Sequence, residues 1–421
     1  MSRRMSHPLL RIVALMLVLA GALVEGQEPS TLSWPIGIGP IQSPAGPNSA
    51  QPQLTTSARG VLLSWIEQDG PKAALRFAER TSNGWSQTRT VASGTDWFVN
   101  WADVPSVLRL ADGTLVGHWL QKSGPDTYAY DVRLSYSRDD GKTWSPSFMP
   151  HTDGTKTEHG FASLFQMPGA GLGLVWLDGR AMTPESNHGD HGAARGAMSV
   201  RFATFDRDWK RTAEVPVDLR VCECCPTTAV VTADGPIAAF RNRSDDEIRD
   251  IYIARYENGK WTEPKAVHQD NWKINACPVN GPMLSARSRD VAIAWFTAKD
   301  DVGRAFVAFS KDAGRTFDAP IRLDDKGALG RVDVELTADG TALASWIEMA
   351  DQRAHFRVRR VNRSGARSPA VTVSSIAGTR ASGYPRIAAA GDEILFAWTE
   401  SVAGVTQVRT ATMRLPANAT R

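Results

Sequence analysis

The chain has 421 residues, of which 42% are hydrophobic and 22% are charged, as in soluble globular proteins. Its formal net charge is +3, and residues 1–26 hold much of it, with Arg3, Arg4 and Arg11 against Glu25. The nearly neutral remainder excludes a basic footprint for nucleic acid, so we predict no nucleic-acid partner. The 14 Trp, 35 Gly and 24 Pro favour many short strands joined by tight turns.

Residues 1–26 have the pattern of a secretory signal peptide. The three arginines precede an apolar run from Ile12 to Val24, and Val24-Glu25-Gly26 is a candidate cleavage site. This run is too short for a bilayer core of about 30 Å, so we predict no membrane span. We therefore expect a monomeric protein that is periplasmic or secreted.

A repeat of small apolar residues ending in an aromatic runs through the rest of the chain, usually with a turn signal shortly before the aromatic. The repeat aromatics are Trp65, Trp119, Trp176, Phe240, Trp295, Trp346 and Trp398, spaced by 54, 57, 64, 55, 51 and 52 residues. Spacings near 50 are typical of one four-stranded propeller blade.

This repeat predicts an all-β fold, a β-propeller with seven blades, against a competing count of six blades and a flanking half-blade. We divide the chain into signal peptide 1–26, linker and closing strand 27–49, propeller 50–417 and tail 418–421. Since the last repeat stops at Leu415, residues 32–41 are the expected source of its fourth strand.

Two segments match the Asp-box pattern Ser-x-Asp-x-Gly-x-Thr-aromatic at the same phase of the repeat. Each forms a turn in which Ser and Asp side chains bind backbone N–H groups, Gly takes a positive φ and the ring packs beneath. The box residues are Ser137, Asp139, Gly141 and Trp144, and then Ser310, Asp312, Gly314 and Phe317. With these motifs the chain resembles the bacterial sialidase-like proteins with Asp-box repeats, over nearly all of the mature sequence. The resemblance implies that the boxes are structural and lie opposite the ligand site.

The segments that enter the inner strands and leave the second strands carry aromatic and charged residues together. The candidate ligand-binding residues are Trp101, Asp178, Arg180, Arg241 and Arg386. Aromatic faces stack on sugar rings and guanidinium groups bind carboxylates, so these residues suit a glycan-like or small anionic ligand. The alternative is a polar rim whose charges pair with one another.

The resemblance also implies an alternative activity, that of an exo-sialidase-type glycoside hydrolase. Such an enzyme needs an arginine clamp, a Tyr nucleophile with a Glu base, and an Asp acid. The matching candidates are Arg180, Arg241 and Arg386 for the clamp, Tyr384, Glu348 or Glu400, and Asp103. The family's Arg-Ile-Pro motif is missing, because Trp34-Pro35-Ile36-Gly37 occupies its place. Whether the chain is an enzyme stays open.

Four cysteines open two neighbouring repeats: Cys222, Cys224 and Cys225 the fourth, and Cys277 the fifth. This arrangement resembles that of exported bacterial sialidase-like propellers. One interpretation is structural disulfides, with or without two free thiols, as in other exported proteins. Another is a strained, redox-active bridge. The third is a Cu or Zn site completed by His188 and His191 from the 181–197 insertion.

Overall fold

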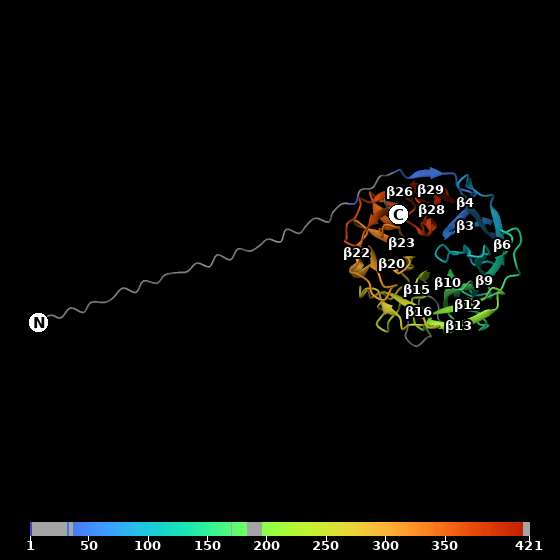
Figure 1. Ribbon diagram of the computed structural model, residues 1–421, viewed down its shortest axis with the longest axis horizontal. Helices are drawn as coiled ribbons and strands as arrows, with labels where there is room; N and C mark the ends of the chain where they lie inside the picture. The colour runs from blue at the N-terminus through green and yellow to red at the C-terminus, as the bar shows by residue number, and fades with distance from the viewer. Residues whose placement is uncertain (2–31, 33–36, 170, 183–195, 416–421) are drawn as a thin grey trace.

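The computed structural model describes Met1, Leu32 and residues 37–169, 171–182 and 196–415. Their strands form seven antiparallel sheets that follow one another around a ring (Figure 1). The fold is thus a seven-bladed β-propeller, which confirms the predicted fold class and decides against six blades. Apart from Met1, the predicted signal peptide lies outside the described residues, as does the tail 418–421. Among the described residues, no helix has the length and hydropathy needed to cross a bilayer.

We number the blades 1 to 7 in chain order. The inner strands are β2 (Ser49–Ser57), β7 (Ser106–Arg109), β10 (His159–Met167), β14 (Thr228–Thr232), β19 (Met283–Arg287), β23 (Ala328–Leu336) and β27 (Arg386–Ala390). The second strands are β3 (Gly60–Asp69), β8 (Leu115–Lys122), β11 (Gly171–Asp178), β15 (Gly235–Arg241), β20 (Asp290–Thr297), β24 (Ala342–Ala350) and β28 (Glu393–Val402).

The third strands are β4 (Lys72–Thr81), β9 (Tyr130–Ser137), β12 (Ser199–Phe205), β16 (Ile251–Glu257), β21 (Arg304–Ser310), β25 (Arg353–Val361) and β29 (Val405–Arg414). The outer strands are β6 (Arg89–Gly94), β13 (Arg211–Asp218), β18 (Lys265–Ala266), β22 (Ile321–Arg322), β26 (Val371–Ile376) and β1 (Gly39–Ile41), with short β5 (Gly84–Trp85) and β17 (Lys260–Trp261) beside them. Two 3₁₀ turns, η1 (Lys299–Asp301) and η2 (Arg380–Ser382), complete the described elements.

Apolar packing between neighbouring blades holds the ring together. All seven repeat aromatics lie on second strands, and Trp65, Trp176, Trp295 and Trp346 are fully buried. One core cluster, for example, joins Trp346 of blade 6 to residues of blade 5. Burying each large side chain stabilises the fold by about 2–3 kcal/mol, so the regular spacing of aromatics specifies the regular stacking of sheets.

The last blade is completed by a strand from the other end of the sequence. β1 pairs antiparallel with β29, with Gly39 opposite Thr412 and Ile41 opposite Thr410. A little further on, Val408 N–H donates to Ser49 Oγ at 2.9 Å. The ring is therefore closed by hydrogen bonds between segments far apart in the chain.

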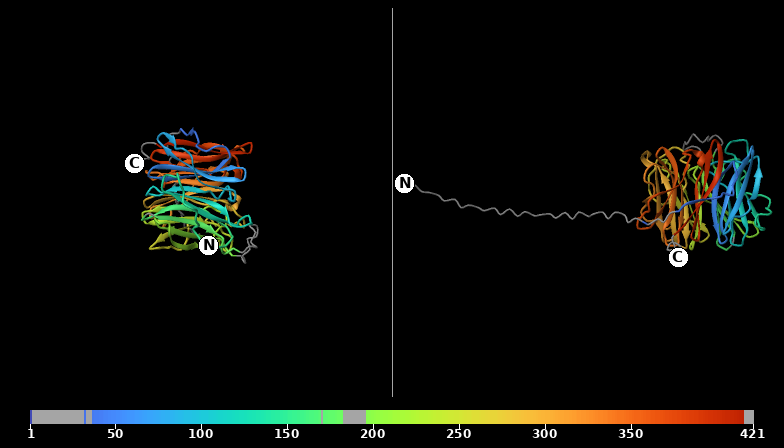
Figure 2. Two further views of the ribbon diagram at one scale, coloured as in Figure 1. Left: turned by 90° about the vertical axis from the view of Figure 1, so that its right-hand side faces the viewer. Right: turned by 90° about the horizontal axis from the view of Figure 1, so that it is seen from above.

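Figure 2 shows the ring edge-on, with its two faces on opposite sides. We call the face where inner strands begin and second strands end the entry face, and the opposite one the hairpin face. The turn at Asp139–Asp140 lies on the hairpin face, because Asp140 accepts a 2.8 Å hydrogen bond from Arg109 at the end of β7. Within this turn Asp139 accepts from the backbone and hydroxyl of Thr143, and these bonds lower the pKa of its carboxyl.

In the second box Asp312 accepts from Ser310 Oγ and from Thr316, and Gly314 N–H donates to Ser310 Oγ. The rings pack as expected for such turns: Trp144 meets Phe77 edge to face at 6.0 Å, and Phe317 packs against the core of blades 4 and 5.

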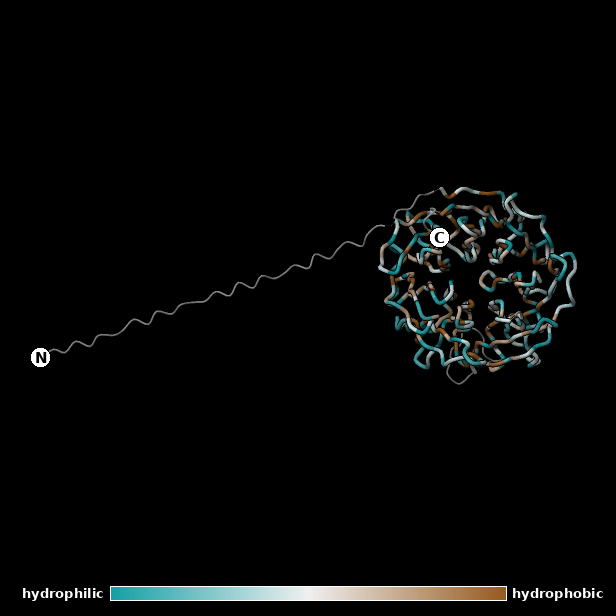
Figure 3. The backbone as a smooth tube through the Cα atoms, in the orientation of Figure 1, coloured by the Kyte–Doolittle hydropathy of each residue, from teal (hydrophilic) through white to brown (hydrophobic). Residues whose placement is uncertain are grey.

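The backbone leaves the middle of the ring open (Figure 3), and side chains of all seven inner strands line a cavity of about 650 Å³ there. Most of its lining is small or apolar, but Asp103, Asp333, Glu335 and Arg386 belong to it.

Candidate functional site

Two aromatic rings and three arginines meet on the entry face beside the cavity. Trp101 and Tyr384, from the loops before β7 and β27, stack with ring centroids 5.9 Å apart. The guanidinium groups of Arg331 and Arg380 lie 4.7 and 5.9 Å from the Trp101 ring. That of Arg386 lies 5.4 Å from the Tyr384 ring. We call these five residues the mouth cluster.

The arginines of the mouth cluster have no carboxylate in ion-pair contact. In the part of the chain that the structure describes, no Asp or Glu oxygen lies within 4.0 Å of Arg331, Arg380 or Arg386. Asp333 acts on Arg386 only from beyond that distance. Burial lowers the pKa of both Arg331 and Arg386, and the nearby charge of Arg380 lowers that of Arg331 further.

The other two arginines of the predicted clamp have different surroundings. Arg241 is buried, and its guanidinium donates to the backbone carbonyls of Asn280, Arg249 and Phe296. Arg180 pairs with Asp178, Asp153 and Glu214 on blade 3. Of the three predicted clamp arginines, Arg386 alone belongs to the mouth cluster. The predicted ligand-binding residue Trp101 also belongs to it.

The three predicted catalytic residues contact separate partners. Tyr384 donates its hydroxyl to Val279 O at 2.5 Å, and burial raises its pKa. Glu348 accepts from Trp346 Nε1 at 3.0 Å and from a backbone N–H at 3.1 Å. Asp103 accepts from Phe161 N–H at 2.7 Å. Burial raises the pKa of Asp103 to about 8, so this carboxyl is largely protonated at neutral pH.

Two further carboxyl groups lie in the central cavity. Burial raises the pKa of Asp333 to about 6. Burial and the charge of Asp333 together raise the pKa of Glu335 to about 8, although Ser285 Oγ donates to it at 3.1 Å. The cavity therefore holds less negative charge at neutral pH than its composition indicates.

The cysteines of blade 4 form a tight cluster, the thiol cluster: Cys222, Cys224 and Cys225. Cys222 Sγ lies 3.4 Å from Cys225 Sγ and 3.9 Å from Cys224 Sγ, whereas a disulfide needs about 2.05 Å. Arg249 Nη1 donates to Cys222 Sγ at 3.2 Å, and Asn280 N–H donates to Cys225 Sγ at 3.3 Å. These three residues are therefore thiols here, not disulfides.

Electrostatics separate the thiols. Burial opposes ionisation of Cys222, yet its sulfur neighbours and the Arg249 charge lower the pKa of Cys222 well below its usual range. Burial raises the pKa of Cys224, and contacts with the other sulfurs, that of Cys277 included, raise it further. Three of the four sulfurs predicted to converge, those of Cys222, Cys224 and Cys225, therefore lie together. His188 and His191 lie outside the described residues.

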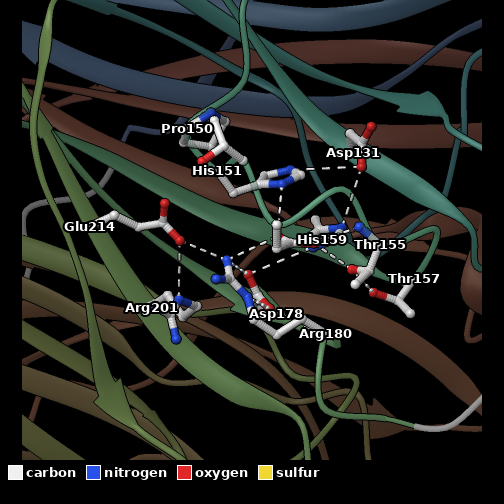
Figure 4. Close-up of polar contacts among 12 residues, drawn as sticks. Asp131, Pro150, His151, Thr155, Thr157, His159, Asp178, Arg180, Arg201 and Glu214 are labelled. Atoms are coloured by element: carbon white, nitrogen blue, oxygen red, sulfur yellow. Dashed lines mark hydrogen bonds and ion pairs between the residues drawn. The ribbon is translucent and has the colours of Figure 1, made fainter.

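A second group of possible metal ligands lies on the entry face between blades 2 and 3 (Figure 4). It joins Asp131 on β9, His151 and Asp153 in the following loop, His159 at the start of β10 and Asp178 at the end of β11. The two imidazole rings stack in parallel, with centroids 3.9 Å apart. Both are buried.

The two histidines differ in charge. Burial opposes protonation of His159, yet contacts with Asp131 and Asp153 raise the pKa of His159 to about 9. Burial and the neighbouring His159 lower the pKa of His151 to about 4. Of this group, the sequence analysis singled out Asp178 but missed His151 and Asp153. The available signal was the run His151-Thr152-Asp153 just before an inner strand.

No protein-family model matches the chain, and no curated protein matches its sequence. Among solved structures, polysaccharide lyase Uly1 is 12% identical with a TM-score of 0.53, covering 94% of both chains. A Dyadobacter fermentans protein of unknown function is 16% identical with a TM-score of 0.51, covering 88% of this chain and 95% of its own. A mutant of the NanB sialidase from Streptococcus pneumoniae is 9% identical with a TM-score of 0.46, covering 90% and 94%. The first two likenesses show that this chain shares its overall fold with these two proteins.

Proposed function

We propose that this protein binds an anionic glycan at the mouth cluster. The observation that carries the proposal is the set of three arginines around two stacked rings, with no carboxylate in ion-pair contact in the described structure. Guanidinium groups bind carboxylate or sulfate groups of a sugar through charge-assisted hydrogen bonds. The half-buried Trp101 offers a face for the apolar side of a sugar ring.

Binding is better supported than sialidase-type hydrolysis. The Tyr384 hydroxyl is engaged by a backbone carbonyl, and Glu348, its predicted base, is engaged by Trp346 and a backbone N–H. A Tyr nucleophile needs its base within hydrogen-bond reach. The fold shared with a polysaccharide lyase agrees with a polymeric sugar ligand, and this likeness adds no catalytic assignment.

The test is titration calorimetry of the mature protein with a trigalacturonate, and with maltotriose as a neutral control. We expect binding of the acidic sugar, weakened by high salt. Arg380→Gln removes an exposed guanidinium and should weaken binding by about 10-fold or more, since a charged hydrogen bond contributes roughly 1.5–3 kcal/mol. Trp101→Ala should weaken binding of the acidic sugar both at low salt and at high salt.

The matched control is Arg138→Gln, which removes an exposed guanidinium from the box turn on the hairpin face. Its affinity should equal that of the unaltered protein. Equal affinity for acidic and neutral sugars, or an Arg380→Gln variant as tight as the control, would refute the proposal.

The thiol cluster supports a second candidate function, and we infer that it holds a soft metal ion. A tetrahedron with Zn–S bonds of about 2.3 Å has S···S edges of about 3.8 Å. The observed separations of 3.4 and 3.9 Å lie close to that value. Thiolates also suit Cu(I).

Metal and free-thiol content of chelator-free protein decides this. We expect the unaltered protein to hold about one equivalent of Zn or Cu more than Cys222→Ser does. Neither metal nor free thiols would show instead that the sulfurs are oxidised to disulfides.

A further inference from the structure

Three buried atoms between blades 2 and 3 lie close together without hydrogen bonds. Asp131 Oδ1, His151 Nε2 and His159 Nδ1 each have no hydrogen-bond partner and are shielded from solvent. Asp131 Oδ1 lies 3.7 Å from His151 Nε2 and 3.4 Å from His159 Nδ1 (Figure 4). Buried polar atoms nearly always have hydrogen-bond partners. Three such atoms without partners at one point therefore indicate that a bound atom or ion belongs between them.

We propose that Asp131, His151 and His159 bind a divalent first-row transition-metal ion, and we call them the histidine triad. Two imidazoles with one carboxylate are the ligand set of catalytic zinc sites and of non-haem Fe(II) sites. Bonds of about 2.1 Å from a tetrahedral ion place its ligand atoms about 3.4 Å apart. The separations of 3.4 and 3.7 Å match that geometry closely.

The far side of the His159 ring is held as a metal-ligating histidine requires. Asp153 Oδ2 lies 3.2 Å from His159 Nε2 in a hydrogen bond, and 3.2 Å from His151 Nδ1, where no hydrogen bond forms. A carboxylate at the second ring nitrogen of His159 fixes its tautomer and leaves the other nitrogen's lone pair for the metal. Asp153 is itself positioned by Thr155 N–H at 2.8 Å and by Arg180 at 3.0 Å.

The distribution of charge favours a cation beside Asp131 and not beside Asp153 or Asp178. Asp153 and Asp178 already pair with Arg180. By contrast, Asp131 has no Lys or Arg nitrogen within 4.0 Å among the described residues, and its ion-pair contacts are the two histidines.

The triad lies nearest to solvent on the Asp131 side. The Asp131 side chain is 16% exposed, whereas the His151 side chain is 3% exposed and that of His159 fully buried, although Asp131 Oδ1 itself is buried. Three protein ligands with an open position bind a water molecule or an oxygen of a small ligand. This inference does not depend on the proposed glycan site.

The experiment is a Co²⁺ titration of chelator-treated, reduced mature protein carrying Cys222→Ser and Cys224→Ser, which separates the triad from the thiol cluster. We expect one equivalent to bind with the visible absorption of a nitrogen–oxygen site and without a thiolate charge-transfer band. Zn²⁺ should displace the Co²⁺. Asp131→Asn and His151→Gln should each weaken binding at least tenfold, as loss of one ligand from a three-ligand site requires.

His268→Gln is the matched control, because His268 also contacts a carboxylate, Asp270 at 2.8 Å, but outside the triad. It should bind Co²⁺ unchanged. If His151→Gln fails to fold, the half-buried Asp131→Asn and imidazole nitrogen NMR of the parent protein with Zn²⁺ still decide the matter. Binding that is absent, or equal in Asp131→Asn and the control, or imidazole signals unmoved by Zn²⁺, would show that the triad is only an internal ion pair.

Discussion

The carboxyl of Glu335 should make the stability of this protein fall as pH rises. In the folded state the pKa of Glu335 is raised to about 8 from an ordinary value of 4.5 by burial in the cavity and the charge of Asp333. The unfolded chain therefore releases this proton near pH 4.5 and the folded chain only near pH 8. Stability is complete below the lower value and is lost progressively up to the higher one.

The full slope is about 1.4 kcal/mol per pH unit, or about 2.7 kcal/mol between pH 5.5 and 7.5. Because Glu335 faces an open cavity, solvent screening reduces this effect, and we expect about 1–2 kcal/mol. Glu335→Gln, a neutral isostere, should abolish that loss. Asp333, whose pKa is about 6, contributes a slope of the same sign in both proteins.

Urea unfolding followed by tryptophan fluorescence at pH 5.5, 6.5 and 7.5 measures the difference. We expect Glu335→Gln to exceed the parent protein slightly at pH 5.5, because the loss begins at pH 4.5, and by about 1–2 kcal/mol more at pH 7.5. The exposed Glu263→Gln should follow the parent at every pH. If Glu335→Gln and the parent keep a constant difference across this range, Glu335 ionises normally and the reasoning is wrong.

Three further variants test the scaffold by urea unfolding at fixed pH. Gly141→Ala places a Cβ 2.5 Å from the Phe77 ring at a φ of +78°, and should cost about 2–3 kcal/mol, against about 1 kcal/mol for Gly154→Ala, where φ is +72° and no atom lies within 4 Å. Equal costs would mean that the box turn is loosely packed. Trp346→Phe leaves a buried carboxylate without its indole donor and a small cavity, and should cost about 2 kcal/mol; a cost near zero would exclude tight packing there. Ser49→Ala removes the acceptor of a buried N–H of β29 and should lower the free energy of unfolding by about 1–2 kcal/mol. An unchanged urea midpoint would mean that this contact between blades 1 and 7 does not stabilise the fold.

The blades were predictable because their signal is local and repeated. A hairpin turn and an aromatic recur at a near-constant interval, and each aromatic lies on the expected second strand. Phe240 shows that the signal tolerates substitution, since it fills the same buried place as the tryptophans. Cys225 and Cys277 occupy equivalent positions of adjacent repeats, so their approach followed from the same periodicity.

The state of each polar group was not predictable, because it depends on contacts across blades. Arg180 and Arg241 were placed on a rim by their positions, but only coordinates reveal the carboxylates and carbonyls that engage them. His151 contacts Asp131 of the preceding strand and Asp153 two residues on. No sequence spacing marks a meeting of side chains from a loop and two strands.

The pairing of β1 with β29 has a consequence for how the molecule comes apart. Ile41 O accepts from Thr410 Oγ1 across 369 residues of sequence, yet β1 itself has only 3 residues. Separating so short a strand from β29 requires little free energy, whereas neighbouring blades share broad apolar interfaces. We therefore expect β1 to detach early in unfolding, while the apolar cluster of Leu54, Trp65 and Leu395 still holds blades 1 and 7 together. A cross-link between β1 and β29 should slow unfolding far more than the small contact area of β1 suggests.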